Sequence, residues 1–360
     1  MKQYIGCDLH RDYSVFASVD ENGRIEGPWR VEHERERAEL RKFLRRFPSG
    51  TPVAVETTGS WYWMIDELEA AGLQPMLANS YEARQRMRGP HKTDPLDARG
   101  LATLLRNGTL PSVWIPAAKL RDLRALMRTR LALVAQRTTI KNRIVAAVNR
   151  YGLRDDSCGD LFIGKGRLRL NVYIAGMPAQ TREAALEEWV VVDELREHIE
   201  NLEQRIAQHI GRIGYVRLLK TMPGVGEILG ATIWLEVGDV ERFPSAAHLA
   251  SYAGLVPTVH ASGGKVHLGP TTRQSNHYLR WAFVEAACSI VALQHRHGPI
   301  HTVLLYQRLK QHKCHGKAAV AVARHLAEST WWILKQKQPY REPVPLAVSS
   351  STHGQARRPF

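Results

Sequence analysis

The fold is decided at the start of the chain, by residues 4–31, YIGCDLHRDYSVFASVDENGRIEGPWRV. Two short runs rich in β-branched and aromatic residues, 4–8 and 13–19, are typical of strands, and a third run follows at 24–31. The Asp-Glu-Asn-Gly segment at 20–23 is a strong turn signal between the second and the third run. These residues predict a three-stranded antiparallel meander.

The segments that follow the meander alternate between apolar runs and helical periodicity. Strands are predicted at 53–56 and 75–79, and helices at about 34–46, 60–71, 80–88 and 94–107. Strands that are first antiparallel and then alternate with helices are typical of a mixed α/β sheet. We therefore predict an α/β domain over residues 1–112.

The chain is strongly basic, with a formal net charge of +15 over 360 residues. Residues 84–150 contain fifteen basic and three acidic residues, a net charge of +12, so most of the excess lies in one stretch. A solvated helix face usually mixes both signs of charge. The charge therefore favours a nucleic acid as the partner.

The sequence contains no run of about 18 apolar residues, which is the length that crosses a bilayer. Its N-terminus lacks the apolar stretch of a signal peptide. We expect a protein without a membrane span, located in the cytoplasm and associated with the nucleoid.

From about residue 117 the apolar residues repeat at helical spacing. This pattern runs through Leu120, Met127 and Val148, and again from Leu195 to Ile213, on either side of a Gly-rich insert at 152–178. It predicts an antiparallel coiled-coil arm over 113–213. Because Lys141 falls on the seam, an ordinary helical hairpin packed on the core stays open as an alternative.

The region from 214 to 337 is predicted to be a mainly helical C-terminal domain. Two helical stretches flank Pro-Gly-Val-Gly at 223–226, as in a helix-hairpin-helix element, and Gly224 and Gly226 would let backbone N–H groups approach a phosphate. Further helices are predicted at about 245–253, 275–294, 299–312 and 316–337. The tail, 338–360, is rich in Pro, Ser, Gly and Arg and is predicted to be disordered.

Four carboxylates are placed where they can meet. Asp8 and Glu56 each end a predicted strand, and Asp94 and Asp97 lie three residues apart where a helix begins, so they share a face. Oxygen ligands without histidine or cysteine suit Mg²⁺, with Mn²⁺ as the alternative, and such ions assist phosphodiester cleavage. Taken singly, each acid could instead cap a helix or lie in a surface turn.

Several blocks of the sequence resemble one protein family. The blocks are IGCDLHRDYSVFASVDENGRI, VAVETTGSWYWMIDEL and HKTDPLDARGLATLL in the first half, and PGVG, EVGDVERF, HLASYAGLVP, SGGK and YLR in the second. They are similar to the DEDD transposases of the insertion-sequence-one-ten family, whose relatives include the Piv and MooV invertases. The resemblance extends from about residue 3 to about residue 335.

The resemblance implies a RuvC-like, ribonuclease-H-type N-terminal domain whose acidic tetrad corresponds to Asp8, Glu56, Asp94 and Asp97. It also implies a coiled-coil arm used in dimerisation and a C-terminal domain with a serine nucleophile. In this family the serine forms a transient phosphoserine link to DNA, and well-studied relatives bind a structured bridge RNA that pairs with target and donor DNA. A dimer or tetramer is expected, with the serine of one subunit meeting the tetrad of another.

The serine that matches the family pattern is Ser262, which precedes two glycines. Flanking glycines would let this loop approach a DNA backbone, although Ser-Gly-Gly is also common in plain surface turns. Ser275 is a rival nucleophile, but it is predicted to cap the helix that follows it. The residues predicted to contact nucleic acid are Arg84, Arg86, Arg88, Lys92, Gly224, Gly226, Lys265 and Arg273.

Three functions follow from these observations. The first is an RNA-guided transposase that cleaves and rejoins DNA with Mg²⁺ and Ser262. The second is a metal-only RuvC-like nuclease, such as a junction resolvase, in which water attacks the phosphate. The third is a nucleic-acid-binding protein without catalysis, whose carboxylates are vestigial.

Overall fold

The computed structural model describes residues 2–87, 93–153, 159–272 and 274–343. The chain divides into two compact units, Met1–Pro116 and Ala117–Phe360. Each unit has its own hydrophobic core.

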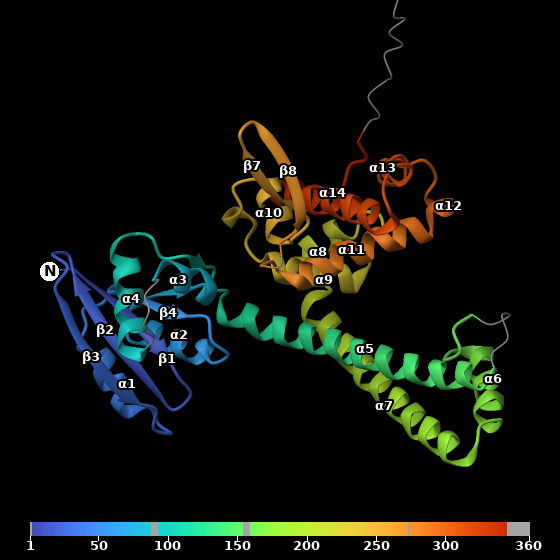
Figure 1. The fold of residues 1–360 in the computed structure, drawn as a ribbon, viewed down its shortest axis with the longest axis horizontal. Helices are drawn as coiled ribbons and strands as arrows, with labels where there is room; N and C mark the ends of the chain where they lie inside the picture. Colours follow the sequence, from blue (N-terminus) through green and yellow to red (C-terminus); the bar gives the residue numbers. More distant parts are fainter. Residues whose placement is uncertain (1, 88–92, 154–158, 273, 344–360) are drawn as a thin grey trace, which may run out of the picture. The chain divides into compact units, whose positions relative to one another are not determined.

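The first unit contains a six-stranded mixed sheet (Figure 1). Its strands are β1 (Gln3–Leu9), β2 (Tyr13–Asp20), β3 (Ile25–Glu32), β4 (Pro52–Glu56), β5 (Gln74–Ala78) and β6 (Ser112–Val113). The order is β3-β2-β1-β4-β5-β6; β1–β3 form the antiparallel meander, and β4 and β5 continue in parallel from β1. The predicted mixed α/β sheet is confirmed, and only the short edge strand β6 was not predicted.

The two faces of this sheet carry different residues because side chains alternate along a strand. On one face, large residues of β1 such as Ile5, Cys7 and Leu9 share a core with α1 (Ala38–Leu44) and α2 (Trp61–Ala70). The opposite face is lined mainly by small residues, including Ala17, Ala54 and Ala78, and packs against α3 (Ser80–Arg86) and α4 (Asp94–Arg106).

Helix α4 approaches the sheet closely at Gly6. A Cβ atom at Gly6 would lie 2.0 Å from the carbonyl oxygen of Ala98 and 2.6 Å from the amide nitrogen of Ala102. Only glycine therefore fits between β1 and α4 at this point. Asp8 lies two residues further along β1, so it also points toward α4.

The second unit begins with an arm of two long helices, α5 (Ala118–Arg150) and α7 (Ala179–Ile210), which pack against each other (Figure 1). The predicted pair of helices is present, and its coiled-coil packing stays a prediction. No helix was predicted within the Gly-rich insert, but it contains α6 (Gly164–Ala175). Leu170 and Ile174 of α6 are buried in a core at the tip of the arm, which explains this helix.

Two positions show how the seam of the arm is packed. The ammonium group of Lys141 lies 3.9 Å from a carboxylate oxygen of Asp160 and 4.7 Å from the ring centroid of Phe162, so the insert accommodates the seam charge. At the end of α7, Ile210 is buried whereas His209 is exposed. The buried face therefore continues through Ile210 and not through His209.

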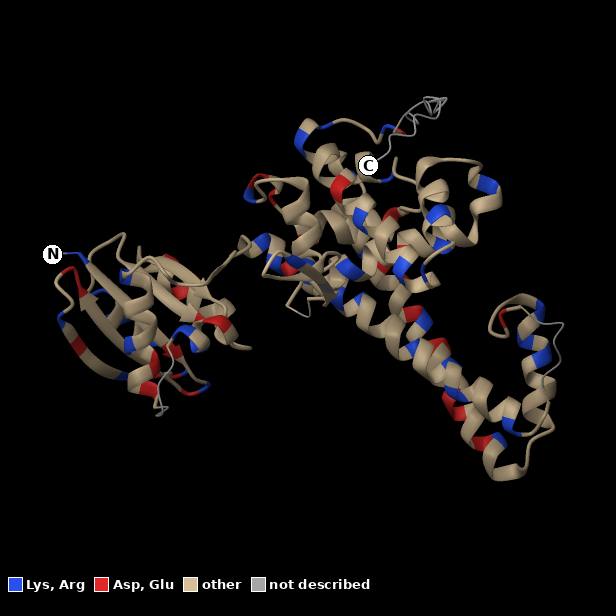
Figure 2. Ribbon diagram, turned by 45° about the horizontal axis from the view of Figure 1, so that its top comes forward, with Lys and Arg blue, Asp and Glu red and all other residues tan. Residues whose placement is uncertain are grey.

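The basic stretch is neutralised in part within the arm. Figure 2 shows both acidic and basic residues along the arm; the basic ones belong mainly to α5 and the acidic ones mainly to α7. Arg130 of α5 pairs with Glu203 of α7 at 2.5 Å, and Arg143 pairs with Glu188. These arginines were counted in the basic stretch, and in the structure each forms an ion pair between the two helices of the arm.

The remaining helices form the C-terminal core, in which α14 packs against α10, α11 and α13. They are α8 (Gly214–Leu219), α9 (Glu227–Val237), the 3₁₀ helix η1 (Val240–Arg242), α10 (Ala246–Tyr252), α11 (His277–Ala292), α12 (Gln294–His297), α13 (His301–Lys310) and α14 (His315–Gln336). Helices α8 and α9 flank the Pro-Gly-Val-Gly segment, and their assignment as a helix-hairpin-helix element stays a prediction.

A buried carboxylate joins the base of the arm to this core. Glu236 of α9 is 1% exposed and accepts two hydrogen bonds from Arg128, at 2.8 and 2.9 Å, and one from Asn276 at 2.8 Å. Arg124 donates to the backbone carbonyls of Leu235 and Glu236. Burial alone would raise the pKa of Glu236, but these hydrogen bonds and positive charges hold it below its usual value.

The end of the chain was predicted to be disordered from residue 338. Residues 338–343 have no helix or strand, but they lie against the core, where the amide of Tyr340 donates to Thr221 Oγ1 at 2.7 Å. The rest of the predicted tail, 344–360, lies outside the described residues. Among the described helices, none combines the length and the apolar composition needed to cross a bilayer.

We expect Gly6→Ala to destabilise the first unit by about 3 kcal/mol, the upper part of the usual range for overpacked cores, because the new methyl group collides with the α4 backbone. Hydrogen exchange of the β1 and α4 amides in the full chain would measure this loss. Gly59→Ala is the matched control, since a Cβ atom there meets open space. Equal protection in both variants would contradict the prediction.

Candidate active site

Two carboxylates lie at the ends of neighbouring parallel strands. The register pairs Cys7 of β1 with Val55 of β4, so the next residue on each strand is Asp8 and Glu56, respectively. By alternation both side chains are on the α4 face of the sheet. Asp8 is 7% exposed and Glu56 is half-buried.

Two further carboxylates come from the first turn of α4. Asp94 and Asp97 both lie there, and the N-cap of the helix is Thr93. The suggestion that Asp94 caps the helix is therefore wrong, because Asp94 is already its first helical residue. Negative charge in a first turn is stabilised by the helix dipole, which helps this helix carry two acids.

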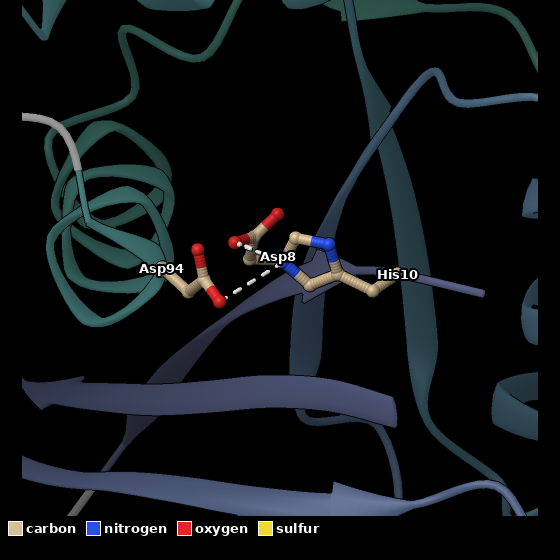
Figure 3. Close-up of side chains that lie close together, drawn as sticks. All are labelled: Asp8, His10 and Asp94. Carbon is tan, nitrogen blue, oxygen red and sulfur yellow. Dashed lines mark hydrogen bonds and ion pairs between the residues drawn. The ribbon is translucent and has the colours of Figure 1, made fainter. Parts of the chain in front are cut away.

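Asp8 and Asp94 meet with a histidine between them (Figure 3). His10 Nε2 lies 3.1 Å from Asp8 Oδ2 and 3.3 Å from Asp94 Oδ2. One ligand atom from each of these three residues lies within 4.8 Å of the others, so the group could hold a metal ion. Glu56 and Asp97 belong to the same face but are not part of this tightest group.

Burial raises the pKa of the Asp8 carboxyl above its usual value. The charge and the hydrogen bond of His10 oppose this rise, whereas the negative charges of Asp94 and Asp97 add to it. Asp97 is therefore close enough to act on Asp8 electrostatically. A divalent cation is the natural counter-charge for such a set of carboxylates.

The structure adds two residues to the predicted tetrad, His10 and Tyr13. The Tyr13 hydroxyl donates to Asp94 Oδ2 at 2.9 Å, and this hydrogen bond raises the pKa of the phenol. The rings of His10 and Tyr13 stack, with centroids 4.6 Å apart. The only signal for His10 in the sequence is its position two residues after Asp8, and this signal is weak because the strand ends at Leu9.

The predicted loop around Ser262 is the turn of a hairpin formed by β7 (Pro257–Ser262) and β8 (Lys265–Thr271). Gly263 and Gly264 have φ values of 56° and 76°, and two consecutive positive φ angles are typical of the tight turn that matches the twist of a hairpin. The glycines are thus required by the turn itself. Ser262 is exposed and pairs with Lys265 across the hairpin.

The two faces of this hairpin differ in chemistry. Directly paired residues share a face, so Ser262 and Lys265 lie on the same face as the pair His260 and His267. The opposite face carries valines such as Val266, which is 64% exposed. Ser262 therefore lies in an exposed row of groups that can contact a phosphate.

Ser275 was predicted to cap the helix that follows the hairpin. The helix instead begins at His277, and the side chain of Asn276 caps it by accepting hydrogen bonds from the amides of Tyr278 and Leu279. The prediction that Ser275 caps this helix is wrong: the N-cap is the next residue, Asn276. The side-chain amide of Asn276 also donates a hydrogen bond to Glu236, which fixes Asn276 in this position. Capping therefore does not argue against Ser275 as the nucleophile, and both Ser262 and Ser275 stay candidates.

The predicted phosphate contact at Gly224 has another explanation. A Cβ atom at Gly224 would lie 2.4 Å from the Ala286 carbonyl oxygen, so glycine is required there for packing against α11. Gly226 faces open space at the N-cap of α9.

Of the basic residues predicted to contact nucleic acid, Arg84 is exposed, whereas Arg86 donates a hydrogen bond to the Thr109 carbonyl. Arg88, Lys92 and Arg273 lie outside the described residues.

Two family models match this chain. A model described as a transposase, of the DEDD type of IS110, matches residues 5–152, which include all four carboxylates. A second model, described as the transposase IS116/IS110/IS902 family, matches residues 216–301, which include the hairpin with Ser262. Together the two models span about two thirds of the chain.

The chain is similar in sequence to several transposases and to an inverting protein, over most or over part of its length. A probable family 20 transposase of Pseudomonas aeruginosa is 25% identical over 94% of this chain and 98% of its own length. The transposase for insertion sequence element IS1111A of Coxiella burnetii is 23% identical over 94% of this chain and 91% of its own. A pilin gene-inverting protein of Moraxella bovis is 30% identical over 34% of this chain and 38% of its own.

Without divalent cations, Asp8→Asn is expected to raise the midpoint of thermal unfolding at pH 7. The folded-state pKa of Asp8 is raised, so the folded state favours the protonated form, and its contribution to stability is lost as the pH rises through that pKa. The variant removes the ionised, buried group. The difference should shrink toward about pH 4, where carboxyls become protonated.

The measurement is calorimetry with a chelator and again with Mg²⁺. Added cation should raise the midpoint of the wild type more than that of Asp8→Asn. The control is Asp12→Asn, which alters a carboxylate with an 82% exposed side chain near the same strand end. A less stable Asp8→Asn protein at pH 7 in chelator would show that His10 fully compensates the buried charge.

Proposed function

The chain belongs to the IS116/IS110/IS902 family of transposases, enzymes that catalyse DNA cleavage and strand transfer, and from this premise we propose how its residues divide the work. The carboxylates Asp8, Glu56, Asp94 and Asp97 bind divalent cations, with Mg²⁺ as the expected ion. Ser262 attacks a DNA phosphate and forms a transient phosphoserine link. The observation that carries this proposal is the cluster of Asp8 and Asp94 on the α4 face of the sheet.

The cation half of the proposal is supported by the chemistry of the residues. Asp8 is buried beside two other acids, its pKa is raised by that burial, and the helix dipole of α4 favours negative charge at Asp94 and Asp97. These oxygen donors fit a hard cation. When bound, such an ion stabilises negative charge that develops on the phosphate oxygens.

The serine half is supported by the form of the hairpin. The two-residue turn places Ser262 beside an exposed lysine, and an ammonium group there would attract a phosphate. A serine hydroxyl is a weak nucleophile, so it needs a partner that takes its proton. A hairpin that projects an exposed serine suits attack on a large substrate such as DNA.

The proposed chemistry exchanges one phosphodiester bond for another. In the first step the Ser262 O–H bond breaks, its oxygen bonds to phosphorus, and a deoxyribose oxygen leaves with a proton. In the second step the hydroxyl of another strand attacks the same phosphorus and restores the serine. Because the bonds broken and formed are of the same kind, the exchange needs no nucleotide cofactor.

We propose that the partners are DNA, a structured bridge RNA and further copies of the chain. The resemblance to RNA-guided relatives and the net charge of +15 support the RNA. Exposed cationic residues such as Arg84 and Lys265 are the proposed contacts, together with Arg86 and Gly226. The arginines of the arm that are paired with glutamates contribute less to nucleic-acid binding than their number in the sequence implies.

A metal-only nuclease is the second candidate function, and one observation favours it. Asp8, Asp94 and His10 form their cluster entirely within the first unit, so water could attack a phosphate there without the hairpin. In that case Ser262 would be a structural residue of a tight turn. The two functions differ in whether the protein becomes bonded to DNA.

Ser262→Ala is expected to abolish the protein–DNA adduct and to lower strand cleavage by at least about a thousandfold, because the nucleophile is lost. The assay is a denaturing gel of protein incubated with end-joined element DNA, flank RNA and Mg²⁺, with and without protease. Ser251→Ala, which alters an exposed serine of α10, is the control. Cleavage that persists in Ser262→Ala without an adduct would establish the metal-only nuclease.

Co-expression with the DNA that flanks its gene is expected to yield protein that retains one discrete RNA after a high-salt wash. Salt weakens non-specific phosphate contacts steeply, so an RNA that remains must be held by its structure. Sequencing of the retained RNA is the measurement. Heterogeneous cellular RNA in its place, or no RNA, would remove the support for a guide.

A further inference from the structure

We infer that His10 is a ligand of the cation site and makes this site prefer Mn²⁺ to Mg²⁺. The inference rests on the proposed binding of a divalent cation by Asp8 and Asp94. It goes beyond that proposal because the tetrad contains only oxygen donors, whereas His10 adds a nitrogen. Three observations carry it: the position of the imidazole nitrogen, the fixed orientation of the ring and the chemistry of the mixed donor set.

The imidazole nitrogen already lies at ligand distance from both carboxylates. His10 Nε2 is 3.1 Å from Asp8 Oδ2 and 3.3 Å from Asp94 Oδ2 (Figure 3). Neighbouring ligand atoms of one cation lie roughly 3 Å apart when each bond is about 2.1 Å long. Both distances from Nε2 match this spacing, and one ligand atom from each of the three residues lies within 4.8 Å of the others.

The orientation of the ring is fixed by its surroundings. The His10 ring stacks on Tyr13, and the Tyr13 hydroxyl donates to Asp94 Oδ2 at 2.9 Å. On Tyr13, the guanidinium of Arg30 lies 3.6 Å from the ring centroid. The backbone amide of His10 donates to the Tyr13 carbonyl at 3.0 Å. These contacts hold Nε2 toward the carboxylates before any ion binds.

A nitrogen donor changes which cation the site prefers. Mg²⁺ is bound by oxygen ligands and keeps several of its waters. Imidazole is a better ligand for transition metals, and affinities for sites with nitrogen donors rise along the series that begins with Mn²⁺. Two carboxylates and one imidazole therefore favour Mn²⁺, while Mg²⁺ gains little from His10.

A different role for His10 predicts a different result. The imidazole could bridge the two carboxylates only by hydrogen bonding, and an incoming cation would then displace it. In that case the bound ion would have oxygen ligands alone. Direct detection of nitrogen bound to the metal separates the two roles.

The test uses the untagged full-length protein with Mn²⁺ alone as the probe. Pulsed electron paramagnetic resonance detects a ¹⁴N nucleus bonded to Mn²⁺, and labelling with ¹⁵N-histidine should change that signal in the unmodified chain. The signal should disappear in His10→Gln and stay in His312→Gln, which alters an exposed histidine after α13. Asp94→Asn should weaken Mn²⁺ binding in the same assay, which locates the ion.

Competition between the two cations gives the second readout. His10→Gln is expected to weaken Mn²⁺ binding by at least roughly tenfold, because loss of a group that merely supports a metal ligand already costs about that much, and to weaken Mg²⁺ binding by much less. Bound Mn²⁺ without nitrogen coupling in the wild type would overturn the role of His10 and leave the proposed function intact. Failure of the wild type to bind either cation would overturn both.

Discussion

The site depends on the contact between the backbone of β1 at Gly6 and the backbone of α4 at Ala98. Asp8 lies two residues beyond Gly6, and Asp94 and Asp97 lie within one turn of Ala98, so this contact sets the distances among the three acids. Like charges repel one another and cannot hold such a cluster by themselves. Tight backbone packing supplies the constraint, and the small residues on this face of the sheet permit it.

The sequence predicted the elements whose cores are local and periodic. Strands β1 to β5 follow from runs of β-branched and aromatic residues, and the long helices follow from apolar residues at helical spacing. Helix α6 was missed because its many basic residues and glycines hide the few positions, such as Leu170, that are buried by the rest of the arm. The hairpin β7–β8 was missed because its exposed faces leave only the two turn glycines as a signal.

The acids of the candidate site could be predicted from the sequence, but their contacts with His10 and Tyr13 could not. Asp8 and Glu56 end predicted strands, and Asp94 and Asp97 begin a predicted helix, so the meeting of Asp8 and Asp94 could be expected from topology, whereas a metal site of all four acids stays a prediction. His10 was not identified, because a histidine just after a strand has no fixed direction until Tyr13 and Asp94 are placed around it. Gly224 shows the opposite case, in which a glycine predicted for phosphate contact is required by helix packing.

The buried Glu236 joins the base of the arm to the start of the helix that follows the hairpin with Ser262. Its carboxylate binds Arg128 at the base of α5 and Asn276, which caps the helix directly after the hairpin. Removing one partner would leave a buried charge without compensation, which is far more costly than losing a surface contact. An arm transplanted from a relative would therefore have to bring its own match for this carboxylate, because Arg128 of the arm and Asn276 at the start of α11 share it.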